Sequence, residues 1–172
     1  PGQITALRGR YGSAGNKDDR FDAFVLADTV RTDRLRLTPL LVDTDDTTVL
    51  RRLCRARKDL LKHRIAAANQ LRAHLDGAMP GAVGLFCALD APISLAFLAR
   101  FGTQDALDGL SEARLAGGLR RQRYSGRTSA AVLLQRIHAA PRGPVGETAA
   151  GLEAITGALL AVLASLVQQI GV

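Results

Sequence analysis

The chain has 172 residues, of which 47% are hydrophobic and 4% aromatic, with no Trp and a net charge of +7. The hydrophobic share excludes global disorder, and the low aromatic share argues against binding single strands by stacking bases on exposed rings. The charge comes almost wholly from Arg and favours a polyanionic partner, DNA or RNA, although an Arg-rich coding bias is an alternative source.

The N-terminal stretch, residues 1–14, is predicted to be a loop with a short helix. It contains Arg8 and Arg10 among several glycines, and it lacks an alternating β-branched run that would form a sheet. Gly- and Arg-bearing segments before a helix can approach phosphates, so both arginines are candidate nucleic-acid contacts. No complete phosphate-loop motif is present.

An acidic helix is predicted over residues 18–32. Asp19 and Asp22 are three positions apart, which places them on one face of the helix with Cβ atoms about 5 to 6 Å apart. Two carboxylates held in this way form one edge of a Mg²⁺ or Mn²⁺ site. The alternative is that Asp18 or Asp19 caps the helix and Asp22 pairs with a neighbouring Arg.

A connector over residues 33–46 leads to the longest predicted helix, residues 48–76, with Asp46 or Thr47 as its N-cap. Apolar side chains recur along this helix at a spacing of three and four, and Arg and Lys cover much of the remainder. Such a stripe requires a partner helix, in this chain or in a second copy. The stripe consists of Leu50, Leu53, Cys54, Leu60, Leu61, Ile65, Ala68, Leu71 and Leu75.

Shorter helices are predicted between residues 81 and 144, capped by Ala91 or Asp90, Thr103, Ser111, and Ser125 or Thr128. Basic residues cluster at the turn between the last two of these helices. The pair is either a helix-turn-helix reader of DNA or a helical hairpin with basic caps, and the hairpin is favoured. The clustered residues are candidate phosphate contacts: Arg120, Arg121, Arg123 and Arg127.

The final predicted helix, residues 148–170, carries a heptad-like apolar seam that is too large to leave in water. Its expected mate is the long helix over residues 48–76, packed antiparallel in the same chain or in a dimer partner. The most apolar run, residues 158–167, is shorter than the roughly 20 residues that span a bilayer, so no membrane insertion is expected. Cys54 and Cys87 are expected to be reduced core residues of a cytoplasmic protein.

The acidic stretch also contains a recognisable sequence motif. Residues 16–28 resemble the Lys-x-Asp-Arg-x-Asp-Ala-x-x-Leu-Ala signature of bacterial DEDD-class transposases of the insertion sequence 110 family, which is related to the Piv DNA invertase. Further segments resemble the same family across most of the chain. These segments are residues 1–12, 50–75, 80–81, 85–86, 92–98 and 124–127.

The resemblance implies an RNase H-like (RuvC-like) domain with four metal-binding acidic residues, of which Asp19 and Asp22 would be the third and fourth. The first Asp, the Glu and a serine-bearing domain would lie outside this chain, which is therefore expected to be an internal piece. Lys17 and Arg20 would lie near the nucleic-acid backbone. Many members of the family are guided by an RNA encoded next to the gene.

These observations predict an all-α chain in two parts. Residues 1–46 are expected to be the remnant of an RNase H-like domain without its sheet, and residues 47–172 a coiled-coil-like assembly domain with short helices. The expected function is that of part of a DNA transposase or recombinase using Mg²⁺ or Mn²⁺, inactive alone. The alternative is a helical dimerisation and nucleic-acid-binding module with no chemistry of its own, which would bind without metal.

Overall fold

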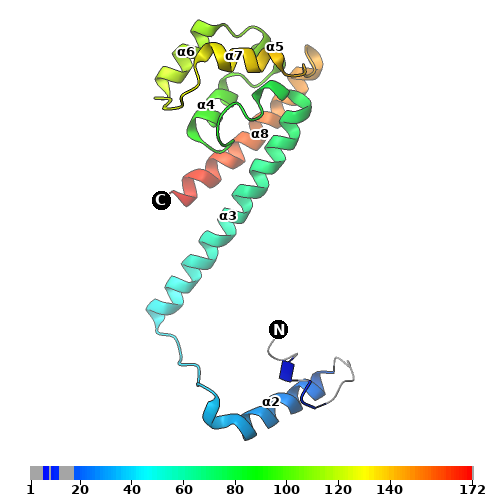
Figure 1. The fold of residues 1–172 in the computed structure, drawn as a ribbon, viewed down its shortest axis with the longest axis vertical. Helices are drawn as coiled ribbons and strands as arrows, with labels where there is room; N and C mark the ends of the chain where they lie inside the picture. Colours follow the sequence, from blue (N-terminus) through cyan, green and yellow to red (C-terminus); the bar gives the residue numbers. More distant parts are fainter. Residues whose placement is uncertain (1–5, 8, 12–17, 172) are drawn as a thin grey trace. The chain divides into compact units, whose positions relative to one another are not determined.

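The computed structural model describes residues 6–7, 9–11 and 18–171 (Figure 1). Within these ranges helices are the only regular elements, which confirms the predicted all-α class. The chain divides into two compact units, Pro1–Thr48 and Val49–Val172. The elements are α2 (Asp19–Asp33), η1 (Arg34–Arg36), α3 (Asp45–Ala78), η2 (Pro80–Ala82), α4 (Pro92–Arg100), α5 (Gln104–Asp108), α6 (Glu112–Arg121), α7 (Ala130–Ala139) and α8 (Glu147–Ile170).

The first unit is organised around α2. Asp18 is its N-cap, because the Asp18 side chain accepts a hydrogen bond from the Arg20 N–H at 3.0 Å. A turn that precedes α2 is fastened to the helix by Tyr11, whose ring packs edge-on against Phe24 at 5.7 Å between centroids. A preceding segment is therefore tied to the middle of the helix.

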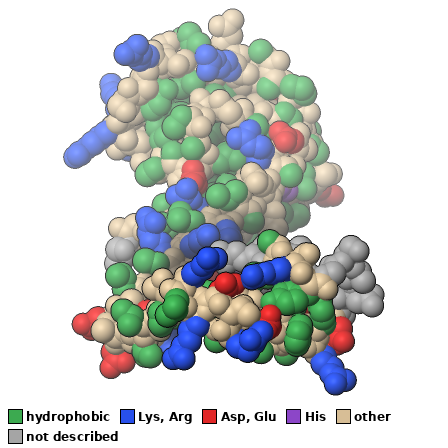
Figure 2. Space-filling view, turned by 60° about the horizontal axis from the view of Figure 1, so that its bottom comes forward, with side chains coloured by type: hydrophobic (Ala, Val, Ile, Leu, Met, Phe, Trp, Pro, Cys, Tyr) green, Lys and Arg blue, Asp and Glu red, His purple; other side chains and the backbone are tan. Residues whose placement is uncertain are grey.

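This unit buries little apolar surface. Among its described residues only Val25 and Thr29 are buried, whereas Leu35, Leu40 and Val42 are at least 94% exposed. Figure 2 shows hydrophobic side chains open to solvent among acidic and basic ones. Exposed large apolar side chains thus outnumber buried ones among the described residues of this unit.

The long helix α3 begins three residues before the predicted start. Thr44 is the capping residue, since its hydroxyl accepts a hydrogen bond from the Thr47 N–H at 3.2 Å. The predicted caps, Asp46 and Thr47, were wrong. Asp46 lies in the first turn of the helix, where its carboxylate interacts favourably with the helix dipole.

The apolar stripe of α3 has two different halves. Toward the C-terminal end Leu71 and Leu75 are fully buried in the core of the second unit. Toward the N-terminal end Leu50 and Leu53 are 62% exposed and Ile65 is 57% exposed. One continuous sequence pattern thus yields a buried half and an uncovered half.

The predicted pairing of the two long helices is confirmed. α8 runs antiparallel to the C-terminal half of α3 (Figure 1), and Leu160 and Leu163 of α8 enter the same core as Leu75 of α3. Half-buried His74 Nε2 lies 2.9 Å from the buried Thr156 Oγ1 of α8. This polar contact fixes the register of the pair inside an otherwise apolar seam.

α8 is longer than its most apolar run. The described residues contain this one helix, Glu147–Ile170, that is long and apolar enough to cross a membrane by length and composition. The expectation drawn from residues 158–167 considered only part of it. Its inner side, with Thr156 and Leu163, packs in the core and against α4, while 17% of its most apolar stretch is buried.

The short helices cover the end of the long pair. Thr103 and Ser111 cap α5 and α6 as predicted, and α4 starts at the proline after Ala91. The prediction of Ser125 or Thr128 for α7 was wrong, because the N-cap is Ser129. Helices α6 and α7 pack directly against each other.

The segment between α7 and α8 is fastened to α5 rather than being a free linker. The Gly143 N–H donates to Gln104 Oε1 at 3.1 Å, and the Gly146 N–H donates to Asp105 Oδ2 at 3.1 Å. The buried Gln104 side chain is thereby satisfied. Gly143 also lies so close to the carbonyl of Ala78 that a Cβ atom would overlap it.

The two cysteines do not occupy the core. Cys54 and Cys87 are both free thiols and both exposed, so their expected core position was wrong. Cys54 lies on the uncovered half of the α3 stripe, where the sequence pattern alone does not distinguish buried from exposed positions.

Candidate functional site

The first turn of α2 carries the predicted carboxylate pair. Asp19 is exposed and Asp22 is half-buried, and both follow the capping residue Asp18 on a regular helical turn. Asp19 makes no hydrogen bond or ion pair with the described part of the chain. Of the two alternatives for Asp18 and Asp19, the capping role belongs to Asp18, which leaves the Asp19 carboxylate available for another partner.

The donor set of this turn fits a hard divalent cation only in part. Carboxylate oxygens are the ligands that Mg²⁺ prefers, and Mg²⁺ is commonly held by one or two protein carboxylates with water and substrate phosphates. In the ranges that the structure describes, no group of three or more His, Cys, Asp or Glu side chains is close enough to hold a metal ion. Asp19 and Asp22 would therefore need ligands from elsewhere.

The other two carboxylates of α2 are structural. Asp28 accepts hydrogen bonds from the Tyr11 hydroxyl at 2.7 Å and from Arg31 Nη2 at 2.6 Å. These bonds, the one from Tyr11 first, hold the pKa of Asp28 below its usual value, and the same contact raises the pKa of Tyr11. Asp33 pairs with Arg10 at 2.8 Å. Sequence reasoning gave Asp28 no role, although Arg31 at the i+3 position was a visible signal.

The predicted basic contacts of the first unit differ in availability. The side chain of Arg10 is 54% exposed but engaged by Asp33, and this contact raises the pKa of the guanidinium. Arg20 is exposed on the same turn as Asp19. Arg8 and Lys17 lie outside the described residues.

The predicted basic contacts of the second unit lie at and beyond the C-terminal end of α6. Arg120 and Arg121 form the last turn, and Arg123 and Arg127 follow in the loop to α7. All four are exposed, and none makes an ion pair with a residue that the structure describes. Unpaired guanidinium groups so close in sequence concentrate positive charge, which attracts phosphate.

The N-terminal part of the chain, including this acidic turn, matches a known family. The DEDD transposase family of the IS110 type, described as transposase, matches residues 1–80. The chain belongs to the IS110 family of transposases. Helices α2 and α3 thus lie entirely inside the part that matches the IS110 family.

Two curated relatives are similar over a longer stretch. A protein named as the mini-circle transposase of IS117 in Streptomyces coelicolor is 35% identical over 127 residues, covering 72% of this chain and 30% of that protein. A protein named as transposase y4uE in Sinorhizobium fredii is 34% identical over 124 residues, covering 72% of this chain and 34% of that protein. The IS110-family chain therefore spans about a third of the length of these relatives. No solved structure was found to match it.

Proposed function

We propose that the chain is part of a longer DNA transposase that cuts and joins DNA strands by metal-dependent phosphoryl transfer. The observation that carries this proposal is the Asp19 and Asp22 pair on the first turn of α2, inside the stretch shared with the transposase family. The short coverage of both relatives and the uncovered apolar surface of the first unit support a longer parent protein.

In this proposal Asp19 and Asp22 hold Mg²⁺ or Mn²⁺ together with acidic residues supplied by the rest of the parent. The bound metal would neutralise charge on the phosphate at which the strand is cut and polarise its oxygens. The α2 turn orients the two carboxylates, and Arg20 on the same turn would hold the nucleic-acid backbone, together with nearby Lys17 and with Arg8 further upstream. The chain by itself would be inactive, because half of the acidic ligands are missing from it.

The test is recombination by the complete transposase between its two DNA substrates, with the RNA encoded beside its gene supplied as a guide. Asp19→Ala and Asp22→Ala should each abolish joined product at saturating Mg²⁺. Asp59→Ala is the matched control, because Asp59 is an exposed acid on α3 that pairs with Lys62 at 3.1 Å. Product formation by both α2 variants at the level of this control would defeat the assignment.

A second function is favoured by the uncovered half of α3. Val49, Leu50, Leu53 and Ile65 are each at least 55% exposed on the N-terminal half of α3, and apolar side chains exposed together can mark an interaction surface. We propose that this face pairs with its equivalent in a second copy of the chain, as a homodimer with a coiled-coil seam. The arginines around the stripe would then bind DNA or a guide RNA without metal.

Analytical ultracentrifugation over a concentration series tests the dimer. Leu53→Asp should shift the chain to monomer, because the new carboxylate would be buried in the seam. Ala66→Asp is the control, since Ala66 is exposed on α3 and off the stripe. A wild-type chain that stays monomeric at all concentrations, or a Leu53→Asp chain that dimerises like wild type, would refute pairing through this face.

A further inference from the structure

Aromatic residues are scarce in the chain but gather in one place. Of its five Phe and two Tyr, four form a continuous series of ring contacts in the second unit. Tyr124 contacts Phe86 at 5.8 Å between centroids, Phe86 contacts Phe97 at 5.6 Å, and Phe97 contacts Phe101 at 5.2 Å. Phe97 and Phe101 are buried, whereas Phe86 and Tyr124 are half-exposed at the edge of the core.

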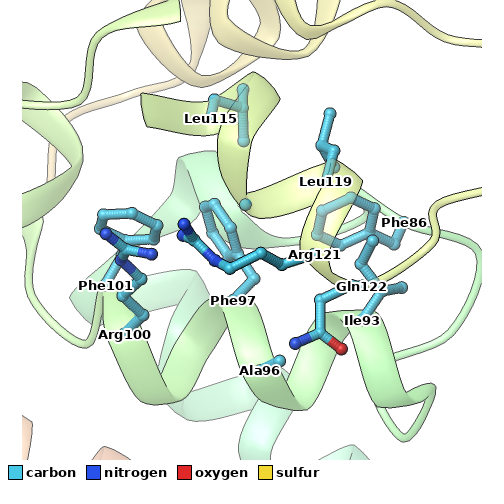
Figure 3. Close-up of a pocket in the computed structure, with 11 residues that line it drawn as sticks. Phe86, Ile93, Ala96, Phe97, Arg100, Phe101, Leu115, Leu119, Arg121 and Gln122 are labelled. Atoms are coloured by element: carbon cyan, nitrogen blue, oxygen red, sulfur yellow. The ribbon is translucent and has the colours of Figure 1, made fainter. Parts of the chain in front are cut away.

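The two half-exposed rings line a hollow of about 330 Å³. This volume lies within the usual range for sites that hold small organic molecules. A narrower cleft of about 60 Å³ continues between α4 and α6 and shares Phe86, Ile93 and Gln122 with the hollow (Figure 3). We call the two together the aromatic groove. Ser125 and Gln122 add hydrogen-bonding groups to its lining.

The charge around the aromatic groove is of one sign. Arg123 lines the larger hollow and Arg121 lines the cleft, where Figure 3 shows the Arg121 side chain reaching across toward Phe97. Arg100 lies over the Phe101 ring at 5.4 Å from its centroid. The described residues that line both parts include no carboxylate. An anionic ligand with a flat apolar part is complementary to this surface.

The backbone at Arg123 has a conformation that is uncommon for a residue other than Gly. Beyond α6 the Tyr124 N–H donates to the Leu119 carbonyl and the Arg123 N–H donates to the Arg120 carbonyl, which is the Schellman pattern of a helix end. Its left-handed position, usually Gly, is occupied by Arg123 with φ 49°. Backbone strain of this kind concentrates at ligand-binding sites, and here the strained residue places its guanidinium group at the edge of the groove.

We propose that the aromatic groove binds an unpaired nucleotide of a single-stranded segment of DNA or RNA. The base would stack on Phe86 and Tyr124, and the neighbouring phosphates would lie against Arg121 and Arg123. A base inside a duplex is already stacked on both faces, so a concave aromatic site selects a strand whose bases are free. This inference rests on the proposed nucleic-acid function and adds the class of strand and its contact residues.

The test is fluorescence anisotropy of the 172-residue chain with a labelled oligothymidylate of about 12 nucleotides, against a duplex of equal length. Tyr124→Leu and Phe86→Leu should each weaken single-strand binding about 5-fold or more, the loss typical of one stacked base, and leave duplex binding unchanged. Gly126→Ala tests the same site with the ring retained, because a Cβ atom there would displace the Tyr124 ring. Circular dichroism confirms that each variant is folded.

Arg123→Gly should also weaken single-strand binding and lower the slope of log K against log salt by about 0.7, the value for one phosphate contact. Arg136→Gln is the charge-matched control, since Arg136 is exposed on α7 and does not line the groove. A wild-type chain that binds neither strand form would overturn the proposed nucleic-acid function together with this inference. Wild-type binding that the groove variants leave unchanged, or weaken equally for duplex and single strand, would overturn the inference alone.

Discussion

Replacing Arg123 by Gly should make the protein more stable. A non-Gly residue in the left-handed region costs about 1–2 kcal/mol, and Arg123 has φ 49°. The glycine offsets about 0.5–1 kcal/mol of the stability gained by removing this strain, because Gly loses more conformational freedom on folding. The net expectation is a free energy of unfolding raised by about 0.5–1 kcal/mol, which corresponds to about 1–4 °C in Tm for a chain of this size.

The assay is urea and thermal unfolding followed by circular dichroism, with Arg123→Ala as the matched control. Alanine also removes the guanidinium but keeps the Cβ atom that makes the left-handed conformation costly, so its stability should stay within about 0.5 kcal/mol of wild type. Equal stability of the Gly and Ala variants would refute the strain at this position. A more stable Arg123→Gly chain that binds single strands less well would show that the position is retained for binding.

Three further predictions concern the packing of the second unit. Gly143→Ala should destabilise the protein by about 2 kcal/mol or more, because its Cβ atom would overlap a backbone carbonyl at the end of α3. Gly151→Ala on α8, with no atom within 4 Å of the new Cβ, should instead stabilise it by about 0.5–1 kcal/mol, and equal effects of the two in urea unfolding would contradict the close approach. Asp108 has a pKa below its usual value, chiefly because Arg142 donates to it, so its stabilising effect should be present above about pH 4 and be lost as the pH falls through the lowered pKa. Asp108→Asn should remove that part of the pH dependence of the urea midpoint, and an unchanged profile would refute the contact. Thr156→Val should cost about 1 kcal/mol in the same assay by removing the hydroxyl that joins α8 to α3, and an unaltered midpoint would contradict that role.

The helices and their order were predictable because their signals are local. Thr103 and Ser111 each precede a short amphipathic stretch and cap it, as expected. The loop before α7 offers several hydroxyl groups within a few residues, and the choice of Ser129 depends on how Leu133 and Ile137 enter the core. Tertiary packing decides between caps that are equivalent in sequence.

Burial along α3 was not predictable from its spacing. The same stripe contains Leu53, which is 62% exposed, and Leu71, which is fully buried, because only one half meets the core of the unit. The aromatic groove was equally invisible, since it joins Phe86 to Tyr124 across 38 positions. The low aromatic content argued against base stacking, because composition is an average over the whole chain. The fold nevertheless brings several of the few aromatic rings together in one groove.

The carboxylate pair, by contrast, came from spacing and from resemblance together. Helical periodicity placed Asp19 and Asp22 on one turn, which the structure reproduces. The role of these residues as metal ligands came only from the family signature, and it stays a prediction. The local structure adds one physical reason in its favour: Asp18 takes the capping bond, so Asp19 is not consumed by it.

The most direct measurement of the central claim is the metal preference of the complete transposase carrying Asp19→Cys. A soft thiolate binds Mg²⁺ poorly, so direct ligation predicts loss of strand joining in Mg²⁺ and a higher ratio of activity in Mn²⁺ to activity in Mg²⁺ than in wild type. Full joining activity of this variant in Mg²⁺, with an unchanged metal ratio, would contradict a metal site at α2.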